Sequence, residues 1–285
     1  MITDAQTNFV YFSELLQTKP EYSAFCERLT SILDKHKIGY AFLKETNDIW
    51  CRDYMPVQVT ENKFIEYRYD PDYLQEKKYR KLKTYPDLVC DSIGLKTIKS
   101  DLILDGGNVI KWGNKVILTD KIISENSTKY RKSELLSKLE LLFEADSIIL
   151  IPWFRGEIFG HADGMIRFID DSHVFIDGYY LNCESEFRNK FYKVLKKNKL
   201  SPIEFVFDAQ KQSNKNWGYL NFLQMNELLL FPQFGIEEDQ QALEKIKQAF
   251  PDYAEKRQIE TLNCNDIIRD GGVLNCISWN IKLRE

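Results

Sequence analysis

The spacing of apolar residues predicts four amphipathic helices separated by shorter apolar runs. In each long segment apolar side chains recur every three or four positions, which gathers them on one helix face. The clearest example begins at Lys132, where Leu135, Leu139 and Phe143 form one stripe. The pattern therefore predicts helices over residues 22–36, 132–145, 186–199 and 238–250.

The short apolar runs between these helices are typical of β-strands joined by tight turns. In the segment 109–118, apolar residues stand on both sides of Gly113-Asn114, a dipeptide that suits a two-residue hairpin turn. Two later segments repeat the plan. We expect a strand at residues 102–104 and hairpins over 109–118, 164–176 and 220–231.

One polar residue stands near the start of each strand unit, at a nearly constant interval. These residues are Asp53, Asp105, Asp163, Asn221 and Cys276, with gaps of 52, 58, 58 and 55 residues. Five units of about 57 residues would fill the 285-residue chain. Radial repetition of such units would bring the five polar residues to one central opening.

Composition and charge narrow the class of protein. An apolar content of 44%, a charged content of 29% and a net charge of -4 are ordinary for a globular chain and predict no binding to nucleic acid or anionic membranes. The N-terminus lacks a signal-peptide pattern, and no apolar run approaches the roughly 18 residues of a membrane span. The basic run 77–83 is interpreted as a solvated helix face in preference to a partner contact.

The cysteines favour a reducing, cytoplasmic setting with most thiols buried and inert. They are widely spaced and show neither a C-x-x-C pair nor a dense disulfide pattern. The six positions are Cys26, Cys51, Cys90, Cys183, Cys264 and Cys276.

Two of these polar positions could carry chemistry. Cys276 follows Gly271-Gly272, which permits close approach of the backbone to a ligand, although a buried strand cysteine is the commoner reading of such a residue. His161 stands two residues before Asp163, so both side chains could face one pocket.

Other readings stay open at this point. His161 could be a loop residue without a role, or it could bind a metal with Asp163 and another aspartate, although no H-x-H or H-x-x-x-H spacing exists. Asp53 could form a plain ion pair with Arg52, and Asp105 could belong to a turn. Phosphate-loop and G-x-S-x-G motifs are absent from the sequence.

Five motifs in order resemble those of agmatine deiminases and Porphyromonas-type peptidyl-arginine deiminases, in the guanidino-group-modifying superfamily. Each motif is weak alone, but together they run from residue 50 to the C-terminus. They are W-C-R-D-Y-M-P from Trp50, D-G-G-N from Asp105, G-H-A-D from Gly160, Y-L-N-F from Tyr219 with P-Q-F-G from Pro232, and G-G-V-L-N-C-I from Gly271.

The resemblance implies a five-bladed pseudo-symmetric α/β propeller (pentein fold), with residues 1–285 as a single deiminase catalytic domain. It also implies hydrolysis of a guanidino group to a ureido group and ammonia, without metal or organic cofactor. Agmatine is the first expected substrate, giving N-carbamoylputrescine for putrescine biosynthesis. Peptidyl or free arginine, and a non-catalytic guanidino-binding protein, are the alternatives. The expected partner is a small molecule, and a homo-oligomer is left open.

Carried over by position, the resemblance makes Cys276 the nucleophile and His161 the acid–base group. Asp53 and Asp163 belong to the catalytic set as guanidinium binders, because paired carboxylates match the paired N–H groups of a planar cation. The expected substrate contacts also include Asn221, Trp50, Asp105 and Arg52.

The chain departs from the family motifs at four positions beside the expected pocket. They are Met55, Asp105, Gly164 and Asn275. These departures make the resemblance a weaker guide to the substrate than to the reaction. An arginine at the pocket mouth would favour arginine as the substrate. Arg155, Arg167 and Arg269 are the candidates for that position.

Overall fold

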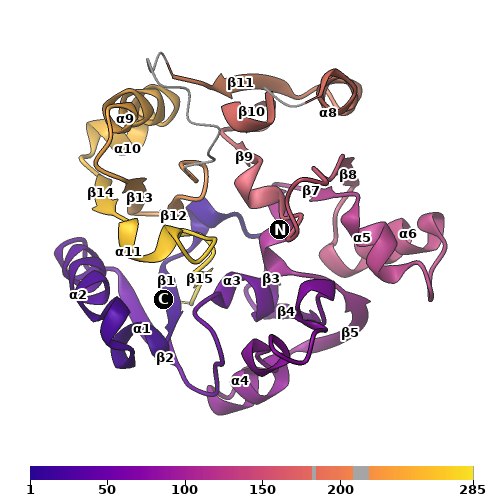
Figure 1. Cartoon of the computed structure of the whole chain (residues 1–285), viewed down its shortest axis with the longest axis horizontal. Coiled ribbons are helices and arrows are strands. Elements are labelled where there is room, and N and C mark those ends of the chain that lie inside the picture. Colours follow the sequence, from indigo (N-terminus) through magenta and orange to yellow (C-terminus); the bar gives the residue numbers. More distant parts are fainter. Residues whose placement is uncertain (182–183, 208–217, 285) are drawn as a thin grey trace.

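A computed structural model describes residues 1–181, 184–207 and 218–284, and its strands form five sheets around a common centre (Figure 1). Every sheet has three strands in the same arrangement. The first two are antiparallel, and the third lies parallel to the second. The repeated unit predicted from the sequence is therefore present as one sheet per blade.

The strands, grouped by sheet, have the following bounds. They are β15 (Trp279–Ile281), β1 (Phe9–Ser13) and β2 (Gly39–Leu43); β3 (Val57–Thr60), β4 (Lys63–Arg68) and β5 (Ile98–Ile103); β6 (Ile110–Trp112), β7 (Lys115–Thr119) and β8 (Ser147–Ile151); β9 (Ile166–Phe168), β10 (His173–Asp177) and β11 (Ser201–Phe205); β12 (Leu223–Met225), β13 (Leu228–Gln233) and β14 (Ile259–Asn263).

Helices connect the two parallel strands of each sheet, because a parallel pair needs a long crossover. In blade order they are α1 (Leu15–Thr18) and α2 (Pro20–Lys35); η2 (Asp72–Leu74), η3 (Arg80–Leu82) and α4 (Pro86–Ser92); α5 (Lys121–Asn126) and α6 (Lys132–Phe143); α7 (Gly178–Leu181) and α8 (Ser185–Lys197); α9 (Glu238–Ala249) and α10 (Pro251–Glu255). Figure 1 shows α2, α4, α6, α8 and α9 on the outside of the ring.

Short helical turns lead from one blade to the first strand of the next. They are α3 (Cys51–Tyr54), η4 (Gly106–Asn108), η5 (Ala162–Gly164) and α11 (Asn265–Ile268), and η1 (Asp4–Gln6) precedes β1. The middle strands β7, β10 and β13 are buried along almost their whole length, and each lies between the inner and the third strand of its sheet. Their continuous apolar runs suit this position.

The four predicted long helices are confirmed by α2, α6, α8 and α9, whose ends lie within two residues of the predicted ends. The three hairpins are also confirmed, as β6–β7, β9–β10 and β12–β13. The helix predicted for the basic run 77–83 is wrong, because only one 3-10 turn, η3, forms there. A segment this short gains too few helical hydrogen bonds to be stable without a buried apolar face.

The two ends of the chain meet in one sheet and close the ring. β15 pairs antiparallel with β1, so that Val10 lies opposite Asn280. A C-terminal strand thus supplies the inner position of the first blade, which β3, β6, β9 and β12 supply in the others. Cys276 stands three residues before β15, as Asp163 stands three residues before β9.

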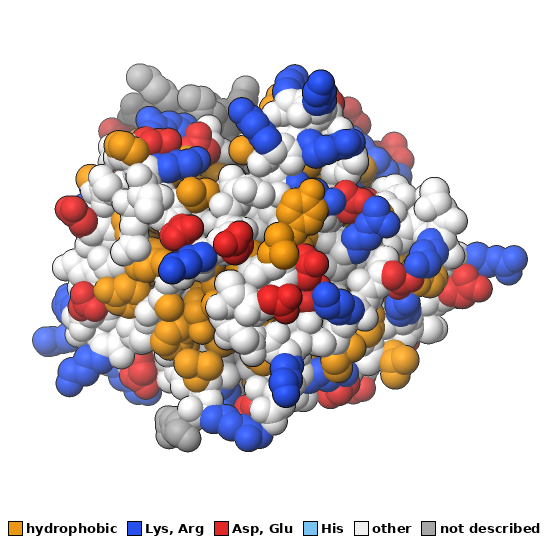
Figure 2. Space-filling model, turned by 90° about the horizontal axis from the view of Figure 1, so that it is seen from below, with side chains coloured by type: hydrophobic (Ala, Val, Ile, Leu, Met, Phe, Trp, Pro, Cys, Tyr) orange, Lys and Arg blue, Asp and Glu red, His pale blue; other side chains and the backbone are white. Residues whose placement is uncertain are grey.

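The surface carries mixed charge. Lysine and arginine side chains alternate with aspartate and glutamate over the face shown in Figure 2, as the near-balanced composition predicts. The five cysteines in the described ranges are buried free thiols, and Cys183 lies outside those ranges. In the part of the chain that the structure describes, no helix is long and apolar enough to cross a membrane.

Candidate active site

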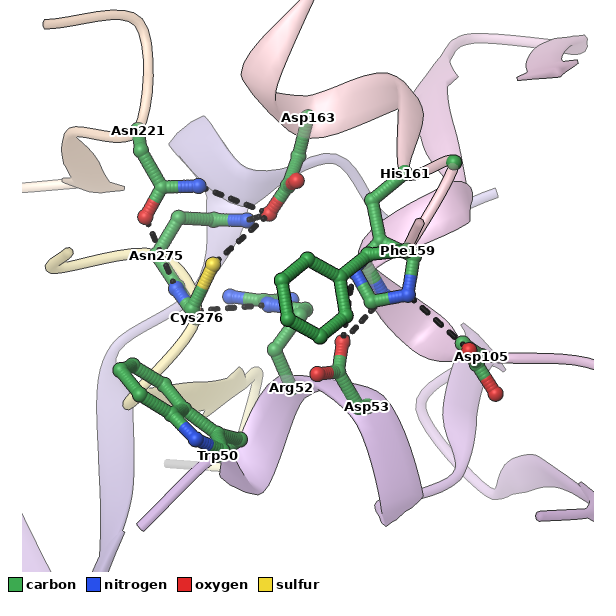
Figure 3. A network of polar contacts seen from close by, with 12 residues as sticks. Trp50, Arg52, Asp53, Asp105, Phe159, His161, Asp163, Asn221, Asn275 and Cys276 are labelled. Atoms are coloured by element: carbon green, nitrogen blue, oxygen red, sulfur yellow. Dashed lines mark hydrogen bonds and ion pairs between the residues drawn. The ribbon is translucent and has the colours of Figure 1, made fainter. Parts of the chain in front are cut away.

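Four of the predicted site residues meet at the centre of the ring, in the turns that precede the inner strands. Asp53 lies in α3, Asp163 lies in η5, Asn221 stands two residues before β12 and Cys276 three before β15. All four, together with His161, line a cavity of about 680 Å³ (Figure 3). The fivefold arrangement of the blades is what brings these distant parts of the sequence together.

Cys276 is held through its backbone and points its thiol at a carboxylate. Its backbone N–H donates to Oδ1 of Asn221 at 3.1 Å, and its carbonyl accepts from the N–H of Arg52 at 3.0 Å. Sγ lies 3.6 Å from Oδ2 of Asp163. Burial, with the charges of Asp163 and Asp53, holds the pKa of this thiol well above its ordinary value.

Two amide side chains fix the carboxylate of Asp163. Nδ2 of Asn221 donates to Oδ2 at 2.9 Å, and Nδ2 of Asn275 donates to the same oxygen at 2.7 Å (Figure 3). These bonds occupy one oxygen and set the plane of the carboxylate. Neither amide contacts the other oxygen, Oδ1.

His161 lies between two carboxylates. Its Nε2 is 3.0 Å from Oδ2 of Asp105, and its Nδ1 is 3.5 Å from Oδ1 of Asp53. Burial alone would lower the pKa of the imidazole, but Asp53, Asp105 and Asp163 outweigh burial and raise the pKa to about 10. The imidazole is therefore protonated at neutral pH and can donate a proton in the cavity.

Tyr73 supports this pair and was not found from the sequence. Its hydroxyl donates at 3.0 Å to Oδ2 of Asp105, the oxygen that also contacts His161. Asp105 itself does not line the cavity. Tyr73 lies in the 3-10 turn η2, within the β4–β5 connection, where apolar residues show no periodic spacing, so no sequence pattern marks it.

Asp53 accepts a hydrogen bond from the backbone N–H of Gly107 at 3.1 Å. Burial raises the pKa of Asp53, and His161 opposes that rise. Gly107 stands three residues before β6, the same distance that separates Cys276 from β15. Gly107 therefore occupies the central position of this blade. The sequence period had assigned that position to Asp105, two residues earlier.

Trp50 and Arg52, both in the first motif, have different positions relative to the cavity. Trp50 lines the cavity, and its ring packs so closely on Gly272 that a Cβ there would lie 2.5 Å from Cζ3. Arg52 does not line the cavity. Its Nε donates to the carbonyl of Asn275 at 3.2 Å and its Nη2 to Oδ1 of Asn280 at 2.5 Å, so Arg52 braces the backbone beside Cys276.

Outside the central group, the lining of the cavity is aromatic and acidic. Its acidic residues are Asp48, Glu157 and Asp270, and burial raises the pKa of Asp48 to about 7. Among residues 1–181, 184–207 and 218–284, no lysine or arginine lines the cavity. The aromatic residues around these acids are Trp50, Tyr69, Tyr73, Tyr79, Phe159, Tyr179 and Tyr180.

The departures from the family motifs lie at different depths. Met55 is buried in an apolar cluster and does not line the cavity. Asn275 also lies outside the cavity lining and acts on Asp163, whereas Gly164 is at the cavity wall. Of these three residues, only Gly164 is placed where it could contact the tail of a substrate.

None of the three candidate arginines lines the cavity. Arg167 is buried, with its Nη2 3.2 Å from Oδ2 of Asp4, and Arg269 is exposed. Arg155 stacks over the ring of Trp153. Within the described ranges, no group of three histidine, cysteine or acidic side chains has the arrangement of a metal site.

Comparisons with known proteins agree with this geometry. The family model for Porphyromonas-type peptidyl-arginine deiminase matches residues 3–281. A Mycoplasma capricolum protein named "putative agmatine deiminase" is 20% identical over 223 residues, which are 67% of this chain and 60% of that protein. The chain thus spans less than two thirds of this relative's length.

Solved structures show the same fold. The agmatine deiminase of C. jejuni superposes with a TM-score of 0.73 at 20% identity, covering 99% of this chain and 96% of that one. That of Enterococcus faecalis gives 0.74 at 17% identity, covering 100% and 96%. The predicted five-bladed α/β propeller is confirmed by these likenesses and by the five sheets. The chain belongs to the Porphyromonas-type peptidyl-arginine deiminase family.

Proposed function

We propose that this protein is a deiminase that hydrolyses agmatine to N-carbamoylputrescine and ammonia, with Cys276 as the nucleophile. The main support for the proposal is that four candidate catalytic side chains line one cavity: Cys276, His161, Asp53 and Asp163. A thiol, a protonated imidazole and two carboxylates together match the needs of hydrolysis at a cationic, planar carbon.

The guanidinium group would lie between Asp53 and Asp163. Asn221 and Asn275 occupy one oxygen of Asp163, so its other oxygen can accept an N–H of the substrate. Both carboxylates are buried, which strengthens their attraction for a cation and disfavours a neutral ureido product.

The chemistry proceeds in two halves. The cationic substrate offsets the nearby carboxylates, and Cys276 gives its proton to water in the cavity. The thiolate attacks the guanidinium carbon, and His161 protonates the nitrogen that leaves as ammonia. Water then adds to the covalent thiouronium, giving its proton to His161. Collapse breaks the carbon–sulfur bond and releases the ureido product, while the hydroxyl proton returns to the Cys276 thiolate. The proton that Cys276 first gave to water ends on ammonia as ammonium.

The acidic lining of the cavity supports agmatine over arginine as the substrate. The four-carbon tail of agmatine ends in an ammonium, which Asp48, Glu157 and Asp270 would attract. The α-carboxylate of arginine would meet these acids without a cation from the described residues to balance it. We further propose that residues 1–285 act as one catalytic domain, in a reducing cytoplasm where the buried thiols stay free.

The direct test is release of ammonia and ureido product from agmatine, free arginine and an arginine peptide under identical conditions. The proposal expects the highest kcat/KM with agmatine. A higher value with either arginine compound would reassign the substrate. No product from any guanidine would refute the deiminase activity itself. Cys276→Ser should abolish turnover, and agmatine binding to that variant should persist in calorimetry.

A further inference from the structure

Lys121 is a buried cation behind the candidate active site that the proposed chemistry does not use. It is the first residue of α5 and is 2% exposed. Its Nζ lies 2.9 Å from Oδ1 of Asp72 and 3.4 Å from Oε1 of Glu125. Burial of an ammonium group without partners costs free energy. The two carboxylate contacts offset that cost and indicate that Lys121 has a structural role.

The first part of that task is to fasten the loop that leads to the acid–base histidine. Nζ of Lys121 donates to the carbonyls of Ile158 at 3.2 Å and Phe159 at 2.9 Å. Oγ1 of Thr119 donates to the next carbonyl, that of Gly160, at 2.6 Å. Three consecutive carbonyls before the histidine are thus held from the β7–α5 connection.

Gly160 shows how closely this loop lies on the lysine. Its φ of +67° suits glycine, and a Cβ at this position would lie 2.7 Å from Cδ of Lys121. The next residue is His161. A shift of the lysine side chain would therefore be transmitted to the imidazole through one peptide unit.

The second part concerns the opposite side of the imidazole. Asp72, which pairs with Lys121, is followed by Tyr73, whose hydroxyl donates to Oδ2 of Asp105. The same oxygen lies 3.0 Å from Nε2 of His161. Nζ of Lys121 is also 5.0 Å from the centre of the Tyr73 ring. One cation therefore holds the segments on both sides of the histidine–carboxylate pair.

We propose that Lys121 is a positioning residue that sets the contact between His161 and Asp105. Its two carbonyl contacts place the histidine, and its pairing with Asp72 places the tyrosine that orients the carboxylate. The kinetic consequence rests on the proposed deiminase function, whereas the placement of the imidazole does not depend on it.

The test compares the wild type with Lys121→Met, which keeps the length of the side chain and removes the ammonium. In kinetics with agmatine, kcat should fall by about 10–100-fold, because small misplacement of an acid–base group is costly. Wild-type protein and Lys138→Met are the controls, since Lys138 pairs with Asp101 on the surface.

A second readout separates positioning of the histidine from loss of structure. The chain has three histidines, so NMR can follow the titration of His161 with His36 and His173 as internal references. His161 faces the carboxyl groups of Asp53, Asp105, Asp163 and Glu157. A weakened Asp105 contact lowers the midpoint of its titration, whereas loss of the nearby ammonium raises it. Because the Asp105 contact is direct, at 3.0 Å, a net fall is expected while the other two midpoints stay in place.

A folded Lys121→Met protein with wild-type kcat and an unchanged His161 midpoint overturns the proposal. If this variant fails to fold, Lys121→Gln takes its place, because the amide still donates to one carbonyl. Smaller changes in kcat and in the His161 midpoint are then expected, and the absence of both would also overturn the proposal. If no guanidine is hydrolysed by the wild type, the deiminase function fails, but the titration still decides the role of Lys121.

Discussion

The thiol of Cys276 points at the carboxylate of Asp163, with Sγ 3.6 Å from Oδ2. A thiol next to a carboxylate keeps its proton, since the thiolate would face a like charge in a buried site. Asp53 adds a second negative group to the same cavity. The free protein therefore holds a neutral Cys276, and a cation must enter the cavity before the thiolate becomes favourable.

This relationship predicts selective alkylation by a cationic reagent. Chloroacetamidine carries its own positive charge and should modify Cys276 at least about 10-fold faster at pH 7 than neutral iodoacetamide, after correction for their reactivity with a free thiol. Time-dependent loss of ammonia release, with mass spectrometry of the modified peptide, measures both rates. The other buried thiols, such as Cys26 and Cys264, should stay unmodified in the folded protein. Equal corrected rates for the two reagents would show that the cavity does not favour a cation.

Asp48 predicts how the tail of the substrate is recognised. At pH 8, where Asp48 is ionised, Asp48→Asn removes one charge from the cavity lining and should raise the KM for agmatine by about 3–10-fold, as expected for loss of a partly exposed ion pair with the substrate. The KM for butylguanidine, which lacks the terminal amine, should not change. Steady-state kinetics with both compounds provide the comparison, and Asp252→Asn, on the exposed side of α10, is the control. An equal effect on both substrates would contradict the assignment of Asp48 to the tail.

The raised pKa of Asp48 also predicts a pH-dependent effect on stability. Burial raises the pKa to about 7 from an ordinary value of 3.8, so Asp48 favours the folded state below pH 3.8 and loses this contribution as pH rises through 7. Asn has no charge to bury. Asp48→Asn should therefore gain about 1–2 kcal/mol relative to the wild type between pH 4 and pH 8, after allowance for partial exposure. Thermal unfolding at the two pH values tests this, and a gain of equal size at both would point to a cause other than ionisation.

The chain shows which features a single sequence can predict. The long helices and hairpins were recognisable because apolar periodicity reflects burial on one face of an element. The central residues were recognisable because each stands just before an inner strand. Tyr73 and Lys121 were not, since their roles depend on contacts between separate connections and no spacing encodes those. Arg52 and Asp105 were expected to contact the substrate, but they lie behind the residues that line the cavity.

Gly107 was also missed, because the conspicuous residue of its motif is Asp105. A Cβ at Gly107 would lie 2.6 Å from Oδ1 of Asp53 and 2.7 Å from Nδ1 of His161. Both distances are shorter than van der Waals contact. Glycine is therefore required where the side chains of Asp53 and His161 approach each other. Gly107→Ala should therefore separate Asp53 from His161, lower kcat by about 100-fold and reduce stability by about 1–3 kcal/mol.

Gly164→Ala is the matched control for stability, because a Cβ there would meet no atom closer than the hydroxyl of Tyr180 at 4.0 Å. Its melting temperature should stay within about 1–2 °C of the wild type, the shift that ~0.5 kcal/mol produces in a chain of this size. Thermal unfolding of both alanine variants separates a local clash from a general cost of replacing glycine, and kcat is compared between Gly107→Ala and the wild type. If Gly107→Ala keeps the wild-type kcat, then Asp53 and His161 can move apart without consequence. In that case their close approach is not part of the catalytic geometry.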